Sequence, residues 1–310
     1  MGEETQPTVP PWADRLGEHL GAFLSLVKAY FAQRDMSITL DLARGTLQLV
    51  REGNVQSSVI GLRNLAQLCA QSPIEQWQSL VALHFDSLLD YFGENQGVQL
   101  LQQLAQARDR LRSRIYPEEI LSHTPDLVYR PGPAGTLEVL VVDLPTSVRT
   151  IARREAEAWG VETDALLDLG RRNLRRFHAL ERHPIALQPG VSVDIYTSDP
   201  YYTASFALLP EVWLADRSAH GALVTLPRRD TLIVHVIRDL GVMDAMEALL
   251  RAAIDLHAEG PGSISPFVYW HRDGEFIKLP YTLEGDTLRL ELPESFVALL
   301  NALERAATLS

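Results

Sequence analysis

The chain of 310 residues contains a single cysteine, Cys69, and only two lysines, Lys28 and Lys278. One cysteine excludes an intrachain disulfide and any zinc or iron–sulfur site that needs several thiolates. Such cysteine usage is typical of a reducing compartment, so we expect a cytoplasmic protein. Nearly all positive charge is guanidinium, which favours paired hydrogen bonds to carboxylate or phosphate, although a GC-rich genome produces the same bias.

Long apolar runs are also missing. The longest, such as residues 137–142, fall far short of the roughly 20 residues that span a bilayer. The first eleven residues are polar and proline-rich, with neither the basic start nor the apolar core of a signal peptide. We therefore expect no membrane span and no export, and we predict that residues 1–11 form a flexible tail.

Positive charge is scarce overall, because 28 lysines and arginines stand against 40 aspartates and glutamates, a formal net charge of −12. The resulting long-range field repels nucleic acid and anionic lipid, which disfavours both as partners. Hydrophobic residues make up 46% of the chain. That content is ample for a core in one large domain or in two ordinary ones.

Several signatures of catalysis are absent. Neither G-x-G-x-x-G nor G-x-x-x-x-G-K-(S/T) occurs, so the common nucleotide-binding loops are missing. Ser263 lacks the following glycine of a serine hydrolase elbow. The nine histidines include no H-E-x-x-H motif, and the sequence predicts neither a metal site nor a cofactor. Cys69 lies among apolar neighbours and is expected to be buried and unreactive.

Hydrophobic periodicity predicts the elements of the N-terminal part. Residues 12–31 repeat apolar positions at helical spacing, and residues 38–42 and 47–49 alternate as the two strands of a hairpin. A third strand is expected at residues 55–60. Two or three helices should follow, near residues 62–70, 74–91 and 98–115.

Four prolines between residues 116 and 133 interrupt regular structure, and we place a boundary there. The predicted organisation is a small N-terminal subdomain at residues 12–116 and a larger C-terminal subdomain at residues 117–310. Strands and helices do not alternate strictly, so the sequence predicts an α+β fold of mixed sheets with helices packed on them.

The C-terminal elements are predicted in the same way. A buried strand at residues 137–142 ends at Asp143, and a helix capped by Thr146 or Ser147 is expected to run to Gly160. Further helices are predicted from Thr163, at residues 202–209 and 243–257, and from Glu294. Further strands are predicted at residues 191–196, 223–226, 231–237, 266–270, 275–279 and 288–290.

The most informative segment is the charged break between the strands at residues 223–226 and 231–237. Pro227 is followed there by Arg228, Arg229 and Asp230, which places three charges at the rim of a sheet. We interpret this rim as a working surface. Charge without a reactive group favours a non-catalytic binding or regulatory module that holds a protein segment or a small anion.

A hydrolase-type enzyme is the alternative. His235, inside the second strand, could act as a general base beside Asp230, with Asp143 contributed from another strand end. Simpler explanations exist for two of these residues. A buried histidine needs hydrogen-bond partners whatever its role, and Asp143 could cap the helix that follows it.

A third hypothesis concerns the arginines between residues 149 and 182, which could hold an anion or nucleic acid. Six interleaved carboxylates reduce the local charge, and ordinary salt bridges explain the pattern equally well. The arginines are Arg149, Arg153, Arg154, Arg171, Arg172, Arg175, Arg176 and Arg182.

Short motifs in a shared order resemble the YtpQ-like bacterial proteins, grouped as domain of unknown function 1444. The motifs are Leu62 to Leu65; Trp159 to Val161 with Arg172 to Leu174; Tyr202, Ala204, Ser205, Leu208 and Leu209; and Gly221 to Ile233 with Pro227, Arg229 and Asp230. Each motif has low specificity, so their order carries the resemblance. It covers residues 12–280 and implies residence in the bacterial cytoplasm, without an activity to transfer.

Overall fold

In the computed structural model, residues 10–50, 59–93, 103–143, 148–214, 218–284 and 287–308 are described. The chain forms two compact units, an N-terminal unit at residues 1–97 and a C-terminal unit at residues 98–310. Antiparallel sheets and helices build both units, so the predicted α+β class is confirmed. The predicted flexible tail lies largely outside the described residues.

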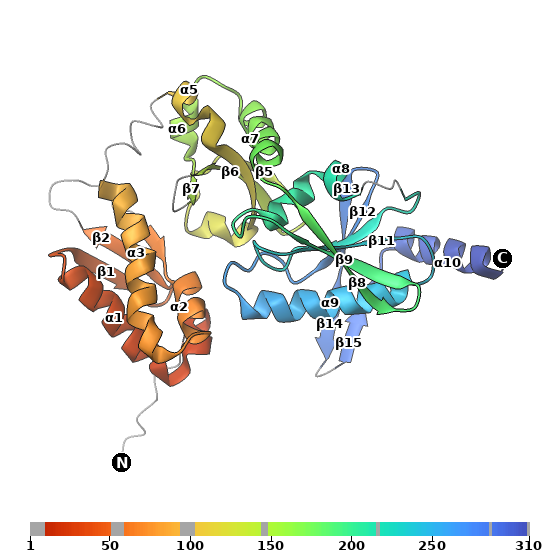
Figure 1. The fold of residues 1–310 in the computed structure, drawn as a ribbon, viewed down its shortest axis with the longest axis horizontal. Coiled ribbons are helices and arrows are strands. Elements are labelled where there is room, and N and C mark those ends of the chain that lie inside the picture. Colours follow the sequence, from red (N-terminus) through yellow and green to blue (C-terminus); the bar gives the residue numbers. More distant parts are fainter. Residues whose placement is uncertain are drawn as a thin grey trace, which may run out of the picture. The chain divides into compact units, whose positions relative to one another are not determined.

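The N-terminal unit is a three-stranded antiparallel sheet with helices packed on it (Figure 1). Its strands, in spatial order, are β1 (Ser37–Asp41), β2 (Thr46–Val50) and β3 (Val59–Gly61). Its helices are η1 (Pro11–His19), α1 (Leu20–Ala32), α2 (Arg63–Ala70), η2 (Ile74–Gln76) and α3 (Trp77–Gly93). The predicted helices and hairpin are confirmed here. Residues 55–58 of the predicted third strand lie outside the described residues.

Trp12 explains why the hairpin turn contains a glycine. A Cβ atom at Gly45 would lie 2.5 Å from Cδ2 of Trp12, and Gly45 has a φ of +62°, which few other residues adopt. The indole Nε1 of Trp12 also donates a hydrogen bond to the carbonyl of Leu42, at 2.7 Å. The first helix is thereby held against the turn between β1 and β2.

The C-terminal unit contains two larger sheets. The first has the order β4, β6, β5, with β7 also paired to β6. Its strands are β4 (Leu111–Pro117), β5 (Tyr129–Pro131), β6 (Thr136–Asp143) and β7 (Val148–Thr150). The helices near it are α5 (Leu104–Ala107), η3 (Arg108–Arg110), η4 (Glu118–Ser122), α6 (Arg153–Glu157) and α7 (Thr163–Phe177).

The predicted helix at residues 98–115 is wrong over its last five residues, 111–115. Residues 111–117 form β4, which pairs with β6 along its whole length. Leu104, Ala107, Leu111 and Ile115 recur at helical spacing, yet Arg112 and Arg114 between them are buried as well. Because β4 belongs to the sheet of the C-terminal unit, the predicted boundary at residue 116 is wrong, and the units divide at residue 97.

The predicted helix from Thr146 or Ser147 to Gly160 is also wrong. Asp143 pairs with Val148, which begins strand β7. Within the described residues of this segment, the one helix is the short α6. The next described element after Asp143 is strand β7, not the helix that Asp143 was expected to cap. Residues 144–147 lie outside the described residues.

The second sheet has six strands in the order β13, β12, β10, β11, β9, β8 (Figure 1). The strands are β8 (Glu181–Gln188), β9 (Val191–Thr197), β10 (Ala222–Thr225), β11 (Leu232–Val236), β12 (Val268–Arg272) and β13 (Glu275–Leu279). All but β8 were predicted. β8 is exposed at every position, so it has no buried side to produce a hydrophobic pattern.

Alternation along β10 and β11 gives the sheet two buried faces. Leu223 and Ile233 pack against α9 (Val242–Glu259) on one face. Val224 and Val234 pack on the opposite face, against η5 (Thr203–Leu208) and α8 (Pro210–Trp213). Burial on both faces explains why these two strands read as continuous apolar runs and not as alternating patterns.

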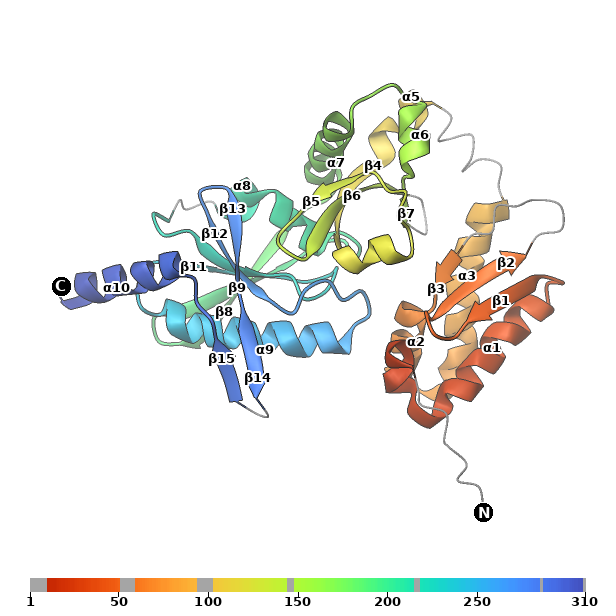
Figure 2. The ribbon, with the colours of Figure 1, turned by 180° about the vertical axis from the view of Figure 1, so that it is seen from behind.

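The chain closes with the hairpin of β14 (Tyr281–Glu284) and β15 (Thr287–Leu290), followed by α10 (Glu294–Thr308). The hairpin extends away from the six-stranded sheet beside α9 (Figure 2). Leu299 and Leu303 of α10 belong to the same hydrophobic core cluster as the buried residues of α9. Across the described part of the chain, we find no helix with the length and apolarity needed to traverse a bilayer.

Helix α7 approaches β4 so closely that only glycine fits at one position. A Cβ atom at Gly170 would lie 2.6 Å from the backbone nitrogen of Ser113. We expect Gly170→Ala to lower the free energy of unfolding by about 2 kcal/mol, because overpacking outweighs the gain of about 1 kcal/mol in helix propensity. Urea unfolding measures the change.

Arg172→Ala is the matched control on the same helix, since Arg172 is exposed. It should change the free energy of unfolding by less than about 0.5 kcal/mol. Equal stability of the two variants would contradict the close approach of α7 to β4.

Candidate functional site

Two of the three charges predicted at the rim, Arg228 and Asp230, form a structural tie. Nε of Arg228 lies 3.2 Å from Oδ1 of Asp230, and its Nη1 lies 3.6 Å from Oε2 of Glu259. The same Nη1 donates a hydrogen bond to the carbonyl of Gly260. Arg228 thus joins the turn between β10 and β11 to the C-terminal end of α9, and its charge is compensated by two carboxylates.

Arg229 is placed differently. Its guanidinium carbon lies 4.9 Å from the centre of the Tyr201 ring. Burial lowers the pKa of Arg229, and the positive charge of Arg114 lowers it further. Its backbone is held on both sides, since its N–H donates to Gly262 and its carbonyl accepts from Ala204. Arg229 is therefore the rim arginine whose guanidinium forms no ion pair within 4.0 Å with any residue that the structure describes.

Arg114 lies next to Arg229 and comes from β4. Arg114 is 7% exposed, and its guanidinium carbon lies 5.7 Å from the centre of the Tyr201 ring. Its Nη1 donates a hydrogen bond to the hydroxyl of Tyr116 at 2.9 Å, while its buried Nε has no hydrogen-bond partner. Among the described residues, no carboxylate lies within 4.0 Å of the guanidinium of either arginine. We name Arg114, Tyr116, Tyr201 and Arg229 the arginine–tyrosine cluster.

Asp143 contacts a second group of polar side chains, which are those of Tyr202, Arg112 and His178. It accepts a hydrogen bond from the hydroxyl of Tyr202 at 2.9 Å, and its Oδ2 lies 3.7 Å from Nη2 of Arg112 and 3.9 Å from Nε2 of His178. Burial and Asp143 raise the pKa of Tyr202. Burial and the charge of Arg112 lower the pKa of His178, so the imidazole is neutral at pH 7.

The two groups of side chains form one polar strip. Arg112 and Arg114 are two positions apart on β4, so they share a face of the sheet. Tyr201 and Tyr202 are consecutive, with one ring near Arg229 and the other bonded to Asp143. Of the five predicted site residues, the structure therefore brings Asp143 and Arg229 into the same neighbourhood. Sequence reasoning missed Arg114 and the tyrosines.

His235 does not join this strip. Its Nδ1 lies 2.7 Å from the carbonyl oxygen of Ser192, and its buried Nε2 lacks a hydrogen-bond partner. His235 pairs with Leu223, whose side chain faces α9, whereas Tyr202 packs on the opposite face of the same sheet. In the described ranges, no hydrogen bond or ion pair joins His235 to Asp230 or Asp143. The three residues of the hydrolase hypothesis are not assembled.

Carboxylates engage four of the eight arginines between residues 149 and 182. Arg171 pairs with Glu138, Arg175 with Glu211, and Arg182 with Asp194, and Arg149 pairs with Glu155. Arg149 lies on β7, whereas Arg153 begins helix α6, so these two arginines do not share a helix face. In the parts of the chain that the structure describes, no three His, Cys, Asp or Glu side chains are grouped to hold a metal ion.

Comparison with known proteins adds no relative: no family model, curated protein or solved structure matches the chain. The resemblance to the YtpQ-like family stays a prediction, and the geometry of the polar strip carries the functional argument.

The hydrogen bond between Tyr202 and Asp143 predicts a stability difference. Tyr202→Phe should lower the free energy of unfolding by about 1.5 kcal/mol, the lower end for a bond to a charged group, because the Asp143 side chain is 28% exposed. Tyr129→Phe is the matched control, since no hydrogen bond of the Tyr129 hydroxyl to a described residue is present. Chemical denaturation compares the two, and equal losses would contradict the assigned bond.

Cys69 predicts a chemical outcome. It is fully buried on α2, and burial raises its pKa to about 11. The thiol should therefore stay protonated and inaccessible at pH 8. We expect no reaction with an aromatic disulfide reagent in the folded protein, and one equivalent of reaction after denaturation. Rapid labelling of the folded protein would contradict the buried position.

Proposed function

We propose that this protein is a non-catalytic binding module that holds a small anion, a phosphoryl or carboxylate group, between Arg114 and Arg229. The observation that carries the proposal is a buried guanidinium group, that of Arg114, beside the half-buried guanidinium of Arg229, with no carboxylate within 4.0 Å of either one in the described residues. The proposal refines the predicted rim, because it retains Arg229 and replaces Arg228 and Asp230 with Arg114.

Electrostatics supports an anionic ligand. Two like charges that are removed from water repel each other and lose hydration, so they destabilise the fold unless an opposite charge compensates them. Two carboxylates of this region are already engaged, Asp143 with Tyr202 and Arg112, and Asp230 with Arg228. An incoming anion would supply the missing charge.

Hydrogen-bond capacity supports the same ligand. The buried Nε of Arg114 is a donor without an acceptor, and a guanidinium presents its donors in a fork that matches the oxygens of a carboxylate or phosphate. The rings of Tyr116 and Tyr201 stack with the guanidinium groups and hold their planes in place. Such restraint reduces the entropy that is lost on binding.

Other functions receive less support. No observation assembles a base, a nucleophile and a ligand cavity around His235, so we do not propose a hydrolase. Four of the eight arginines at residues 149–182 are paired with acids, which favours the salt-bridge interpretation for those four, and the net charge of −12 disfavours nucleic acid as a partner. Residence in the bacterial cytoplasm, implied by the resemblance and by the single cysteine, stays part of the proposal.

Titration with an anion tests the proposed site. We expect inorganic phosphate or acetate to bind the full chain in isothermal titration at constant ionic strength, and the stronger of the two identifies the class of anion. Arg229→Gln should weaken that binding at least tenfold, because one of the two guanidinium groups is lost. The melting temperature of the free variant should be unchanged or higher, since the repulsion from Arg114 is removed.

Arg228→Gln is the control at the adjacent position. It should retain anion binding within about twofold and lower the melting temperature, because it breaks the tie to Asp230 and Glu259. Absence of saturable binding of both anions, or equal loss of affinity in the two variants, would show that the arginine–tyrosine cluster is not an anion site.

A further inference from the structure

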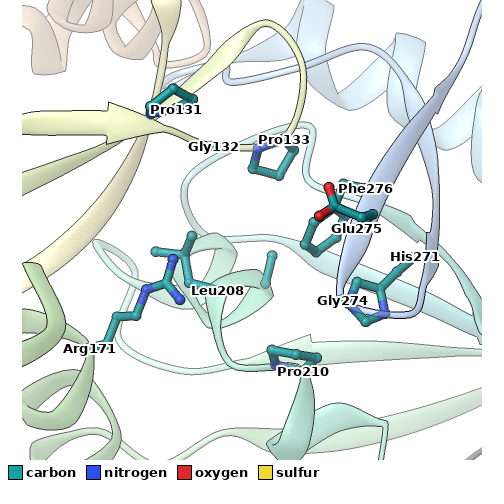
Figure 3. A pocket seen from close by; sticks show the side chains of 11 residues that line it. Pro131, Gly132, Pro133, Arg171, Leu208, Pro210, His271, Gly274, Glu275 and Phe276 are labelled. Atoms are coloured by element: carbon teal, nitrogen blue, oxygen red, sulfur yellow. The ribbon is translucent and has the colours of Figure 1, made fainter. Parts of the chain in front are cut away.

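A second site lies in a cleft of about 260 Å³ in the C-terminal unit, which we name the hairpin pocket (Figure 3). The turn before β6, the end of η5 and the β12–β13 hairpin form its walls. The lining residues are Pro131, Gly132, Pro133, Arg171, Ala207, Leu208, Pro210, His271, Gly274, Glu275 and Phe276. It shares no residue with the arginine–tyrosine cluster.

His271 is the observation that points to a ligand. Its ring lines the pocket, yet the residue is only 4% exposed, and neither Nδ1 nor Nε2 has a hydrogen-bond partner among the residues that the structure describes. The ring is held in place by Trp213 and Phe276, whose ring centres lie 5.2 and 4.7 Å away. A buried imidazole without partners is costly, and a bound molecule with a donor or an acceptor would satisfy it.

Charges of opposite sign line opposite sides of the pocket. Arg171 stands on one side and Glu275 on the other (Figure 3). Nε and Nη2 of Arg171 donate to the carboxylate of Glu138 at 2.8 and 2.6 Å, which holds the guanidinium and leaves Nη1 without a described partner. Glu275 has no cation within 4.0 Å among the described residues. The pocket thus offers a donor at one end and an acceptor at the other.

The remaining surface sets the size and shape of the ligand. Pro131, Pro133 and Phe276 provide apolar contacts between the two charges. The volume lies below the 300–1,000 Å³ typical of sites for drug-sized ligands, so the ligand is small. Because Glu138 balances much of the charge of Arg171, a ligand with a single negative charge would meet the uncompensated Glu275 unfavourably.

We propose that the hairpin pocket binds a small zwitterion, of the class of free amino acids and dipeptides. The carboxylate of the ligand faces Nη1 of Arg171, its ammonium group faces Glu275, and a polar atom of the ligand bonds the ring of His271. Such a molecule uses all three polar groups of the pocket at once, whereas a simple anion or a simple amine uses only one of the two charges.

The test uses the full chain and a pair of charge-deleted analogues. Glycine and glycylglycine are titrated to about 10 mM, which detects a Kd in the millimolar range, while NMR follows the imidazole protons of His271. We expect a saturable shift with at least one of the two. N-acetylglycine, which lacks the ammonium group, and glycinamide, which lacks the carboxylate, should bind at least tenfold more weakly.

Glu275→Gln should weaken binding of the zwitterion at least tenfold and leave the melting temperature unchanged, because Glu275 is exposed. Glu304→Gln removes an exposed carboxylate of α10 and serves as the control, with unchanged affinity. No saturable shift of His271, equal binding of a charge-deleted analogue, or unchanged affinity in Glu275→Gln would overturn the proposal. Phosphate binding at the arginine–tyrosine cluster is measured in a separate titration, so the result for one site does not depend on the result for the other.

Discussion

The position of β4 is the constraint on which the C-terminal unit depends. One edge of β4 pairs with β6, while the backbone N–H of Ile115 on β4 donates to the hydroxyl of Ser205 in η5, at 3.1 Å. The backbone of β4 also receives α7 at Gly170. Strand β4 thus contacts β6 in the first sheet, helix α7, and η5, which packs on the second sheet. The side chains at residues 111–115 are therefore buried whether or not they are apolar.

Burial of this strand determines the electrostatics of the candidate site. Arg112 is compensated, because it lies near Asp143 and donates to the backbone carbonyls of Asp109 and Leu111. Arg114 shares its face of the sheet but meets Arg229 and two tyrosines instead of an acid. The same strand therefore carries one satisfied guanidinium and one unsatisfied guanidinium, and that difference separates a structural contact from a ligand site.

Hydrophobic patterns in the sequence predicted most helices and strands. They gave the wrong element where one segment fitted both a helix and a strand, and they missed a strand that has no buried side. β4 carries apolar residues at helical spacing, so periodicity favoured a helix that the pairing with β6 overrides. β8 has no buried side, so it carries no pattern. Of the candidate site, Asp143 and Arg229 were selected from their sequence context. Arg114 was not predicted, because its neighbour in space, Arg229, is 115 positions away in the sequence. A strand prediction for residues 111–117 would have placed Arg112 and Arg114 on one face of a buried strand, which is an unusual position for two arginines.

The sequence by itself determined the α+β class, the two apolar strands around Pro227 and the burial of Cys69, because each depends on hydrophobic patterns among neighbours in the chain. Only the tertiary structure decided which charges are compensated. Arg228 forms an ion pair with Glu259, the ring of His271 has no hydrogen-bond partner among the described residues, and Arg114 lies beside Arg229. Coulomb energy and desolvation depend on distance and burial in space, and neither quantity is encoded in separation along the chain.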